Sequence, residues 1–424
     1  LLTTLLLPLT MFSQTQLGSD INGEASYDQS GVSVSINSDG TKVAIGATKN
    51  DGGGSDSGHV RVYQYSSSSW SQIGSDINGE ATNDSSGQSV SLSSDGTVVA
   101  IGATKNDGGG DNSGHVRIYQ YSGSSWVQLG DDIDGESPYD YSGHSVSLSS
   151  DGMVVAIGAY GNNGGNFTGH VRVYSYYNNQ WNQRGADLDG EAAVDQSGYS
   201  VSLSSDGTKV AIGAPFNDAN GSSSGHVRVY RYDLGSWGQL GSDIDGEAAG
   251  DRSGFSVSLS SDGTKVAIGA PFNDANGSSS GHVRVYEYSG SSWSQLGSDI
   301  DGEAANDNLG NAVSLSSDGT KVAIGAPSND ANGSNSGHVR IYEYDGGSWS
   351  QPVVDIDGEA AGDTSGRSVS LSSDGTKVAI GALANDGNGS NSGHVRVYDI
   401  LTPEISSVSL AADNSTITVT TSLS

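Results

Sequence analysis

The stretch that decides the fold is SVSLSSDGTKVAIGA, residues 256–270, whose pattern changes at a central Asp-Gly pair. Residues 256–260 alternate small polar with apolar side chains, which indicates a strand with one buried face. Asp-Gly is typical of a tight turn, and the apolar run 265–270 predicts a strand buried on both faces. Residues 282–288 alternate again, and 293–297 form a short fourth strand. The stretch therefore predicts an antiparallel unit of four strands.

This unit occurs seven times along the chain. A Gly-His pair and a Ser-Asp-Gly turn both recur at steps of 55 or 56 residues. Repeats of this length are typical of propeller blades or solenoid coils. The repeated histidines are His59, His115, His170, His226, His282, His338 and His394.

The two ends of the repeat array favour the propeller over the solenoid. Tryptophans mark a fourth strand in six copies, whereas the seventh copy ends at Tyr398 without one. The sequence TQLGSDI at 15–21 matches SQIGSDI at 71–77, so an N-terminal strand can complete the last blade. Such closure removes the open edges of the sheets. We therefore predict an all-β fold, a seven-bladed propeller of four-stranded blades over residues 15–402.

Two segments lie outside the repeats. Residues 1–14 contain an apolar run of the length found in signal peptides, too short to span a bilayer, although a buried first strand is the alternative. Residues 405–421 alternate like the opening strand of another β domain, so we expect residues 403–424 to be a linker and the truncated start of that domain. We predict a secreted or cell-surface protein with further domains in its parent chain.

The motifs of the unit resemble the FG-GAP repeat. Gly-Ala-Pro at 269–271 matches the family motif, and Ser253-Gly254 stands where the family has Phe-Gly. This is the blade of integrin α-subunit propellers and of many bacterial surface proteins, and the resemblance covers residues 15–400. It implies a propeller with a role in adhesion. The family's calcium loop between the first two strands is not carried over, because residues 260–263 supply a single carboxylate there.

Charge and composition exclude several classes of function. The chain has 49 acidic and 18 basic residues, a net charge of −31, and no cysteine. A nucleic-acid binder needs a basic surface, and an anionic membrane would repel this one. Without cysteine there are no disulfides, thiolate zinc sites or cysteine nucleophiles. We therefore expect no nucleic-acid partner and no direct membrane insertion.

The acidic residues gather on one face of the predicted propeller. Strand alternation places 35 of the 49 in the loops from strand 2 to 3 and from strand 4 to the next strand 1. Carboxylates from neighbouring loops could bind calcium, whereas the alternative is a solvated surface of turn formers. The candidate calcium ligands are Asp187, Asp189, Glu191, Asp195, Asp243, Asp245, Glu247, Asp251, Asp299, Asp301, Glu303, Asp307, Asp355, Asp357, Glu359 and Asp363.

One position before the first strand differs in every copy, although its flanks barely change. Scaffold packing therefore does not dictate it, and a ring of different side chains near the channel suits a binding surface. Tolerated drift at an exposed site is the alternative. The seven residues are Val32, Gln88, His144, Tyr199, Phe255, Asn311 and Arg367.

The repeated histidines are expected to pack or to hydrogen-bond, because each is alone on its blade. His144 lies outside their pattern and has no evident partner. The GSSSG segments at 221–225 and 277–281 match Gly-x-Ser-x-Gly, but they lack the strand-turn-helix context of a nucleophile. Carboxylates that repeat blade by blade do not make a unique catalytic site, so we predict no enzymatic activity.

These observations predict a non-catalytic extracellular adhesion or recognition module of a larger protein. It would bind a glycan or a protein through the acidic face, with calcium as a candidate aid. The main alternative is a structural spacer or display scaffold without a specific ligand. A polysaccharide-active enzyme is the third hypothesis.

Overall fold

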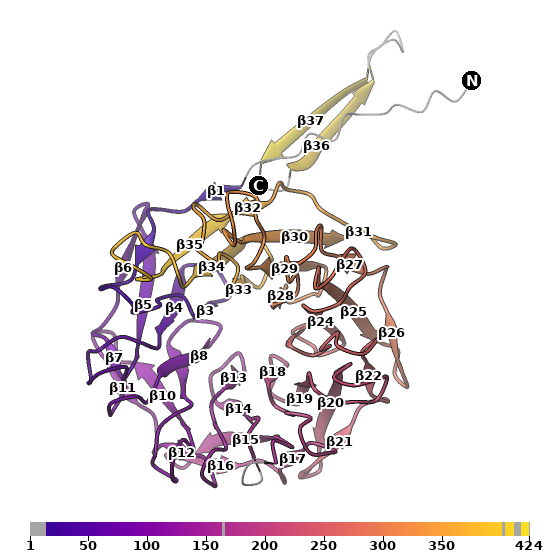
Figure 1. Ribbon diagram of the computed structural model, residues 1–424. Coiled ribbons are helices and arrows are strands. Elements are labelled where there is room, and N and C mark those ends of the chain that lie inside the picture. The colour runs from indigo at the N-terminus through magenta and orange to yellow at the C-terminus, as the bar shows by residue number, and fades with distance from the viewer. Residues whose placement is uncertain (1–13, 163–165, 401–402, 411–416, 424) are drawn as a thin grey trace.

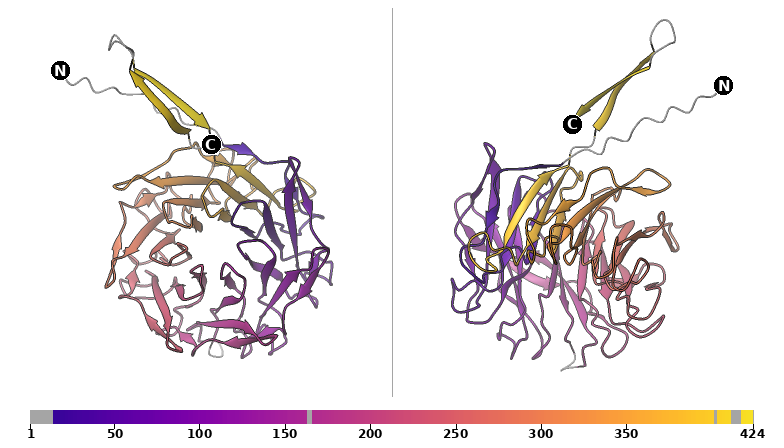
Figure 2. Two further views of the ribbon diagram at one scale, coloured as in Figure 1. Left: turned by 180° about the vertical axis from the view of Figure 1, so that it is seen from behind. Right: turned by 45° about the horizontal axis from the view of Figure 1, so that its top comes forward.

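The computed structural model describes residues 14–162, 166–400, 403–410 and 417–423, so residues 1–13 of the expected signal peptide lie outside it. Seven antiparallel sheets form a closed ring (Figures 1 and 2). The prediction of an all-β, seven-bladed propeller is confirmed. Within the part of the chain described, no helix has the length and apolar character to cross a membrane.

Blades are numbered 1–7 by their innermost strands, which alternate apolar and serine side chains. These are β3 (Ser33–Ile36), β8 (Ser86–Leu92), β13 (Ser145–Leu148), β18 (Ser200–Leu203), β23 (Ser256–Leu259), β28 (Ala312–Leu315) and β33 (Ser368–Leu371). The buried second strands are β4 (Lys42–Ala47), β9 (Val98–Ala103), β14 (Val154–Ala159), β19 (Lys209–Ala214), β24 (Lys265–Ala270), β29 (Lys321–Ala326) and β34 (Lys377–Ala382).

The outer strands begin at the repeated histidines. The third strands are β5 (His59–Ser66), β10 (His115–Tyr121), β15 (His170–Tyr177), β20 (His226–Asp233), β25 (His282–Tyr288), β30 (His338–Tyr344) and β35 (His394–Asp399). The fourth strands of blades 1–6 are β6 (Ser69–Gln72), β11 (Trp126–Gln128), β16 (Gln180–Gln183), β21 (Ser236–Gln239), β26 (Trp293–Gln295) and β31 (Trp349–Ser350).

Each blade also has a fifth strand of two residues, which the sequence pattern did not indicate. It pairs with the start of the third strand, as in His282 opposite Asp301. The third strand is longer than the fourth, so it leaves backbone groups free for this pairing. The fifth strands of blades 1–6 are β7 (Ile77–Asn78), β12 (Ile133–Asp134), β17 (Leu188–Asp189), β22 (Ile244–Asp245), β27 (Ile300–Asp301) and β32 (Ile356–Asp357).

The N-terminus closes the ring, as predicted. β1 (Thr15–Gln16) pairs with β35 and takes the place of a fourth strand in blade 7. β2 (Ile21–Asn22) then pairs with the start of β35 as its fifth strand. At the other end, β36 (Pro403–Leu410) and β37 (Ile417–Leu423) form an antiparallel hairpin, so residues 403–424 contribute two strands rather than the single expected one.

The core lies between neighbouring blades. Val227 and Val229 of blade 4 pack against Leu259, Val266 and Ile268 of blade 5, and all five are buried. Burying a side chain of this kind contributes about 1.5–3 kcal/mol. Equivalent clusters join the other blades, so the apolar second strands hold the ring together.

Serine hydroxyls join the innermost strands of neighbouring blades. The Ser258 hydroxyl accepts the Leu315 N–H at 2.9 Å, and the same contact recurs at all seven junctions. The Ser256 hydroxyl donates to the Gly310 carbonyl at 2.8 Å. The blades approach so closely there that a Cβ on Gly269 would lie 2.1 Å from that oxygen. The alternating serines therefore hold adjacent blades by hydrogen bonds.

Candidate functional site

The variable ring surrounds one mouth of the central channel. Six of its seven residues line a depression there together with the serines and valines that begin the innermost strands. Val32 occupies the corresponding position before β3, and all seven side chains are half-buried. The structure therefore brings together the residues that the sequence placed in a ring. The six that line the depression are Gln88, His144, Tyr199, Phe255, Asn311 and Arg367.

Aromatic side chains occupy one sector of this mouth, in blades 3–5. The ring centroid of His144 lies 4.6 Å from that of Tyr160 and 4.7 Å from that of Tyr199. Tyr199 lies 4.9 Å from Phe255, which in turn lies 6.1 Å from Phe272. We call these five residues the aromatic arc. Each such contact contributes about 0.5–1.5 kcal/mol beyond burial, so the arc is a packed surface.

Two members of the arc were not singled out from the sequence. Tyr160 follows the end of β14, and Phe272 lies two residues beyond the end of β24. Blade 1 has Thr48 and Lys49 at these loop positions, and blade 6 has Pro327 and Ser328. Variation directly after the repeated Gly-Ala pair was the signal that could have found them.

Further side chains extend the arc. The ring of Tyr141 stacks on that of Tyr160 at 5.1 Å with the planes 4° apart. The guanidinium of Arg252 lies 4.7 Å from the centroid of Phe216 and 4.4 Å from that of Phe272. Tyr141 and Arg252 occupy the same repeat position and adopt φ of 54° and 55°. The φ at this position lies between 54° and 57° in all seven copies, so this conformation belongs to the repeated scaffold.

The charges at this mouth belong to arginines. Burial, together with the cation of Arg367, lowers the pKa of His144 to about 4. Burial raises the pKa of Tyr160 to about 12. Both rings are therefore neutral at pH 7, and the Arg367 guanidinium donates to the side-chain oxygen Oδ1 of Asn311 at 2.8 Å. His144, for which the sequence indicated no partner, packs against two tyrosines.

The candidate calcium ligands of each copy separate into different environments. The Asp251 carboxylate is buried and accepts the Ala248 N–H at 3.1 Å and the Asn273 side-chain amide at 3.0 Å. It therefore fixes a turn. The residues in this position are Asp195, Asp251, Asp307 and Asp363. The Asp245 carboxylate has one oxygen that is buried without a hydrogen-bond partner, as do those of Asp301 and Asp357.

The first carboxylate and the glutamate of each copy lie beside histidines of different blades. Asp243 Oδ2 is 3.8 Å from His226 Nδ1, whereas Glu247 Oε2 is 3.8 Å from His282 Nδ1 in the next blade. The fifth strand lies between these carboxylates, and the chain passes to the next blade after it. The repeated histidines are therefore not alone on their blades, since an aspartate of the same blade or a glutamate that follows the preceding blade lies within 4.0 Å of each.

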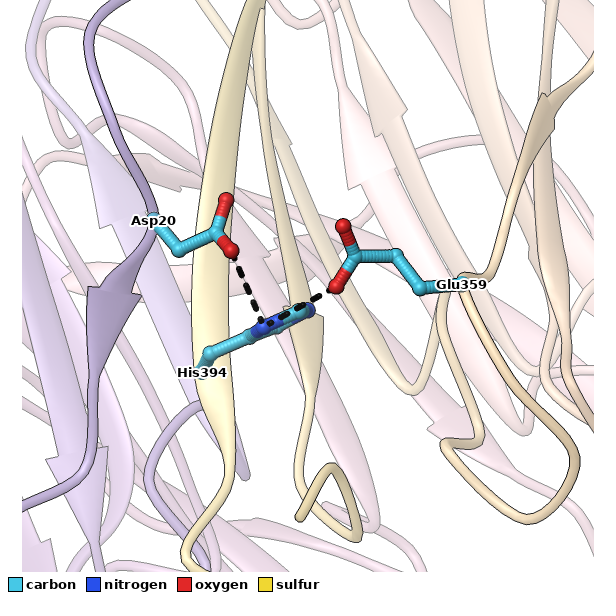
Figure 3. A group of neighbouring side chains, drawn as sticks. All are labelled: Asp20, Glu359 and His394. Carbon is cyan, nitrogen blue, oxygen red and sulfur yellow. Dashed lines mark ion pairs between the residues drawn. The ribbon is translucent and has the colours of Figure 1, made fainter. Parts of the chain in front are cut away.

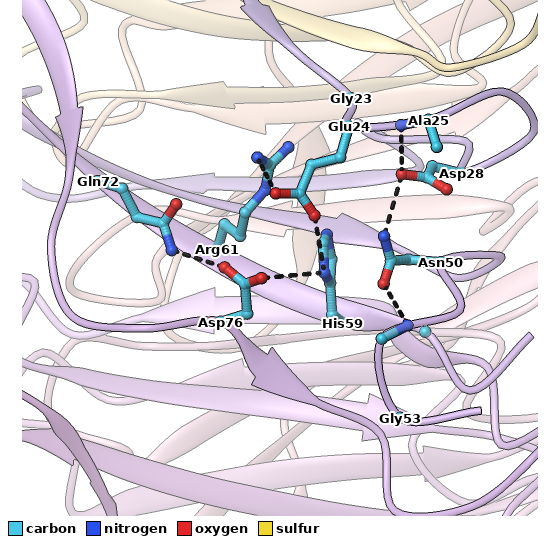
Figure 4. A network of polar contacts seen from close by, with 12 residues as sticks. Gly23, Glu24, Ala25, Asp28, Asn50, Gly53, His59, Arg61, Gln72 and Asp76 are labelled. Atoms are coloured by element: carbon cyan, nitrogen blue, oxygen red, sulfur yellow. Dashed lines mark hydrogen bonds and ion pairs between the residues drawn. The ribbon is translucent and has the colours of Figure 1, made fainter.

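We call each such group a Glu–His–Asp triad. The glutamate comes from the segment after the fifth strand of the preceding blade, and the histidine and aspartate come from one blade. Figure 4 shows Glu24, His59 and Asp76, and Figure 3 shows Asp20, Glu359 and His394 at the ring closure. The other groups whose ligand atoms lie within 4.8 Å of one another include Glu80–His115–Asp132, Glu136–His170–Asp187 and Glu191–His226–Asp243.

Four stretches of the chain match the family model described as FG-GAP repeat, at residues 188–230, 244–286, 300–342 and 353–398. The chain carries FG-GAP repeats. The resemblance seen in the sequence is thereby confirmed, and each matched FG-GAP stretch begins at or near a fifth strand and ends in the following third strand. No curated protein matches the sequence.

Solved propellers share the fold of this chain. The β-propeller domain of Cps50 (Swd1) from Myceliophteria thermophila is 10% identical with a TM-score of 0.58, covering 91% of this chain and 99% of that one. A putative 6-phosphogluconolactonase from Bacteroides uniformis is 11% identical with a TM-score of 0.51, covering 77% of this chain and 85% of that one. At these identities the likeness shows the fold alone.

Proposed function

We propose that this propeller is a non-catalytic recognition module of a secreted or cell-surface protein, and that it binds a glycan at the aromatic arc. One observation carries the proposal: the arc breaks the seven-fold symmetry of the scaffold, at the variable ring and in the adjoining loops after the second strands. Half-buried rings with a few polar neighbours are typical of ligand sites. Flat aromatic surfaces of this kind can stack on the C–H faces of sugar rings.

The charge distribution favours a neutral glycan over an acidic one. The surrounding face carries most of the acidic residues of a chain with net charge −31, so it repels anionic sugars at long range. Arg252 and Arg367 supply hydrogen-bond donors at the mouth itself. The same charge speaks against nucleic acid and anionic membranes as partners.

The composition of the depression supports a role without catalysis. Its lining residues include no carboxylate, so a glycosidase couple of two acids has no place in it. The neighbours of the His144 ring are the aromatic side chains of Tyr160 and Tyr199. We infer that the mouth holds a ligand by contact and hydrogen bonding.

Binding to a panel of immobilised neutral and acidic oligosaccharides tests the proposal. We expect saturable binding to a neutral glycan that weakens at least about tenfold in Tyr199→Ala and in Phe255→Ala, because central aromatic contacts dominate binding energy. Tyr27→Ala is the matched control, since this tyrosine is 63% exposed on the same face outside the arc.

Other results would favour the other hypotheses. Binding that persists unchanged in both arc variants would place the ligand elsewhere. No saturable binding to any glycan or protein would favour the spacer. Turnover of a polysaccharide that disappears on changing one carboxylate would favour an enzyme.

Calcium assistance is a separate part of the proposal. A ligand that binds only the folded state raises the melting temperature by mass action. We expect a rise in calcium over EDTA that an equal ionic strength of sodium does not produce. The absence of a rise would leave the acidic loops as turn formers on a solvated surface.

A further inference from the structure

We propose that the Glu–His–Asp triads bind divalent transition-metal ions and that these ions clamp neighbouring blades together. The proposal is independent of the glycan site, because the triads lie at the start of the third strands rather than at the channel. It assigns a role to polar groups that the scaffold otherwise leaves without partners.

The spacing within a triad suits a bound ion better than direct hydrogen bonds. His115 Nδ1 lies 3.8 Å from Glu80 Oε2 and 3.7 Å from Asp132 Oδ2. Such distances are too long for hydrogen bonds. Zinc ligands lie about 2.0–2.2 Å from the metal. Two ligand atoms of one ion therefore lie farther from each other than hydrogen-bonded atoms do, as the atoms of a triad do. Both carboxylates lie within 4.0 Å of the histidine in the triads of His59, His115, His226 and His394.

The repeated histidines are buried, and in four of them the nitrogen that faces the carboxylates has no hydrogen-bond partner. Each repeated histidine side chain is only 1% exposed. The Nδ1 atoms of His59, His226, His282 and His338 are buried without a hydrogen-bond partner. Buried polar atoms are nearly always satisfied, so an unpaired nitrogen beside two carboxylates is suited to bind an ion.

Neighbouring side chains hold the carboxylates in position (Figure 4). The Gln72 amide donates to Asp76 Oδ1 at 2.7 Å, and the Arg61 guanidinium lies 3.3 Å from Glu24 Oε1. Each carboxylate thereby keeps its other oxygen toward His59. The pattern recurs at His226, where Gln239 and Arg228 hold Asp243 and Glu191. Residues that orient metal ligands in this way are typical of built sites.

The donor set determines the class of ion. One imidazole nitrogen and two carboxylate oxygens suit zinc and its first-row neighbours, whereas calcium and magnesium prefer oxygen alone. Two carboxylates and one arginine leave one net negative charge, which attracts a cation. The glutamate and aspartate are partly exposed, so water can complete the coordination.

The position of a triad makes the ion a clamp between blades. At the ring closure, Glu359 follows β32 of blade 6 and His394 begins β35 of blade 7 (Figure 3). Asp20 lies in the N-terminal segment just before β2. An ion there would tie the N-terminus to two blades, at the one junction that no continuous chain makes.

Three triads differ from the others, and we expect weaker binding there. In blade 3 the Asn162 amide contacts His170 Nδ1 at 2.5 Å and so competes with an ion for that nitrogen. In blade 6, Arg340 lies 3.4 Å from Asp355 and competes for it. In blade 5, His282 has one carboxylate within 4.0 Å, that of Glu247. Four complete triads therefore remain as the principal sites.

Titration of the full chain with zinc chloride after treatment with EDTA tests the proposal. Calorimetry should detect about four equivalents, as the four complete triads require. His226→Gln should lower the count by about one and reduce the zinc-dependent rise in melting temperature. His144→Gln, which removes the one histidine outside the triads, should leave the count unchanged.

A second variant separates loss of a site from loss of folding. Glu191 is about half-exposed, so Glu191→Gln should preserve the circular dichroism spectrum and still weaken one site. Zinc uptake that is absent, or that is unchanged in both His226→Gln and Glu191→Gln, would overturn the proposal. Loss of glycan binding without any change in zinc uptake would concern the aromatic arc alone.

Discussion

The two mouths of the channel lie at opposite ends of the same seven innermost strands, yet they differ in kind. One mouth is lined in every blade by Leu or Ile and by serines of the Ser-Asp-Gly turn. The other is lined by residues that differ in every blade. The difference shows at which positions contacts between blades restrict the choice of residue.

At the uniform mouth each blade is bonded to the next. The Ser261 N–H donates to the Ser317 carbonyl at 2.8 Å, and seven such bonds form a closed circle. A change in one copy would therefore disturb two blades. At the variable mouth a residue such as Phe255 comes just before the first paired residue of its strand, Ser256, so strand pairing does not fix its side chain and each copy can carry a different residue. The serines of the circle are Ser38, Ser94, Ser150, Ser205, Ser261, Ser317 and Ser373.

The strongest test of this comparison measures the stability lost in Leu259→Ala and in Phe255→Ala, because both residues belong to blade 5. Leu259 is 7% exposed and packs between blades, so its truncation should cost about 2–5 kcal/mol in the free energy of unfolding. Phe255 is half-buried at the variable mouth, and its truncation should cost about 1 kcal/mol. Urea unfolding measures both, and equal losses would contradict the comparison.

A second test concerns the position that directly follows the variable residue in each blade. Blade 5 has Ser256, which donates to the next blade, whereas blade 6 has Ala312 at that position. Ala312→Ser should restore a hydrogen bond toward Gly366 and raise the free energy of unfolding by about 0.5–1.5 kcal/mol. Ser256→Ala should lower it by a similar amount. If both changes had the same sign, the serines would not be the contacts that join the blades.

A third test concerns the pH dependence of His144 at the variable mouth. Its pKa is about 4 in the folded protein and 6.5 in the reference state, because burial and Arg367 disfavour the charged ring. The folded state binds this proton more weakly than the unfolded state does. Its contribution to stability is therefore complete above pH 6.5 and is lost as the pH falls from 6.5 to about 4.

Urea unfolding at neutral and at acidic pH checks this prediction. Wild type should lose more stability on acidification than His144→Gln does. Titration of the His144 ring by NMR gives its midpoint directly. A midpoint near 6.5 would contradict the burial of the charged form.

Several features followed from local patterns. The step between Gly-His pairs, the alternation in 256–260 and the match of 15–21 to 71–77 predicted the blades and their closure. These predictions of the blades were correct because strand pairing within a blade joins neighbouring segments of the chain. The variable ring was also found, since a changing residue between constant flanks is visible in one sequence.

Other features depend on contacts between blades. Glu191 and His226 form part of one triad although 34 residues lie between them, and the nearby Glu247 belongs to another. His144 and Tyr160 meet across a loop, and Tyr199 joins them from the next blade. No repeat spacing indicates such pairs.

The amino-acid sequence by itself determined the number of blades, the four main strands of each, the closing strand and the position of the variable ring, because each depends on local periodicity or on copies that can be compared directly. Only the tertiary structure decided which aromatic rings form the arc and which carboxylates face each histidine. The distance and angle between neighbouring blades set those contacts, and they arise from packing of the whole ring.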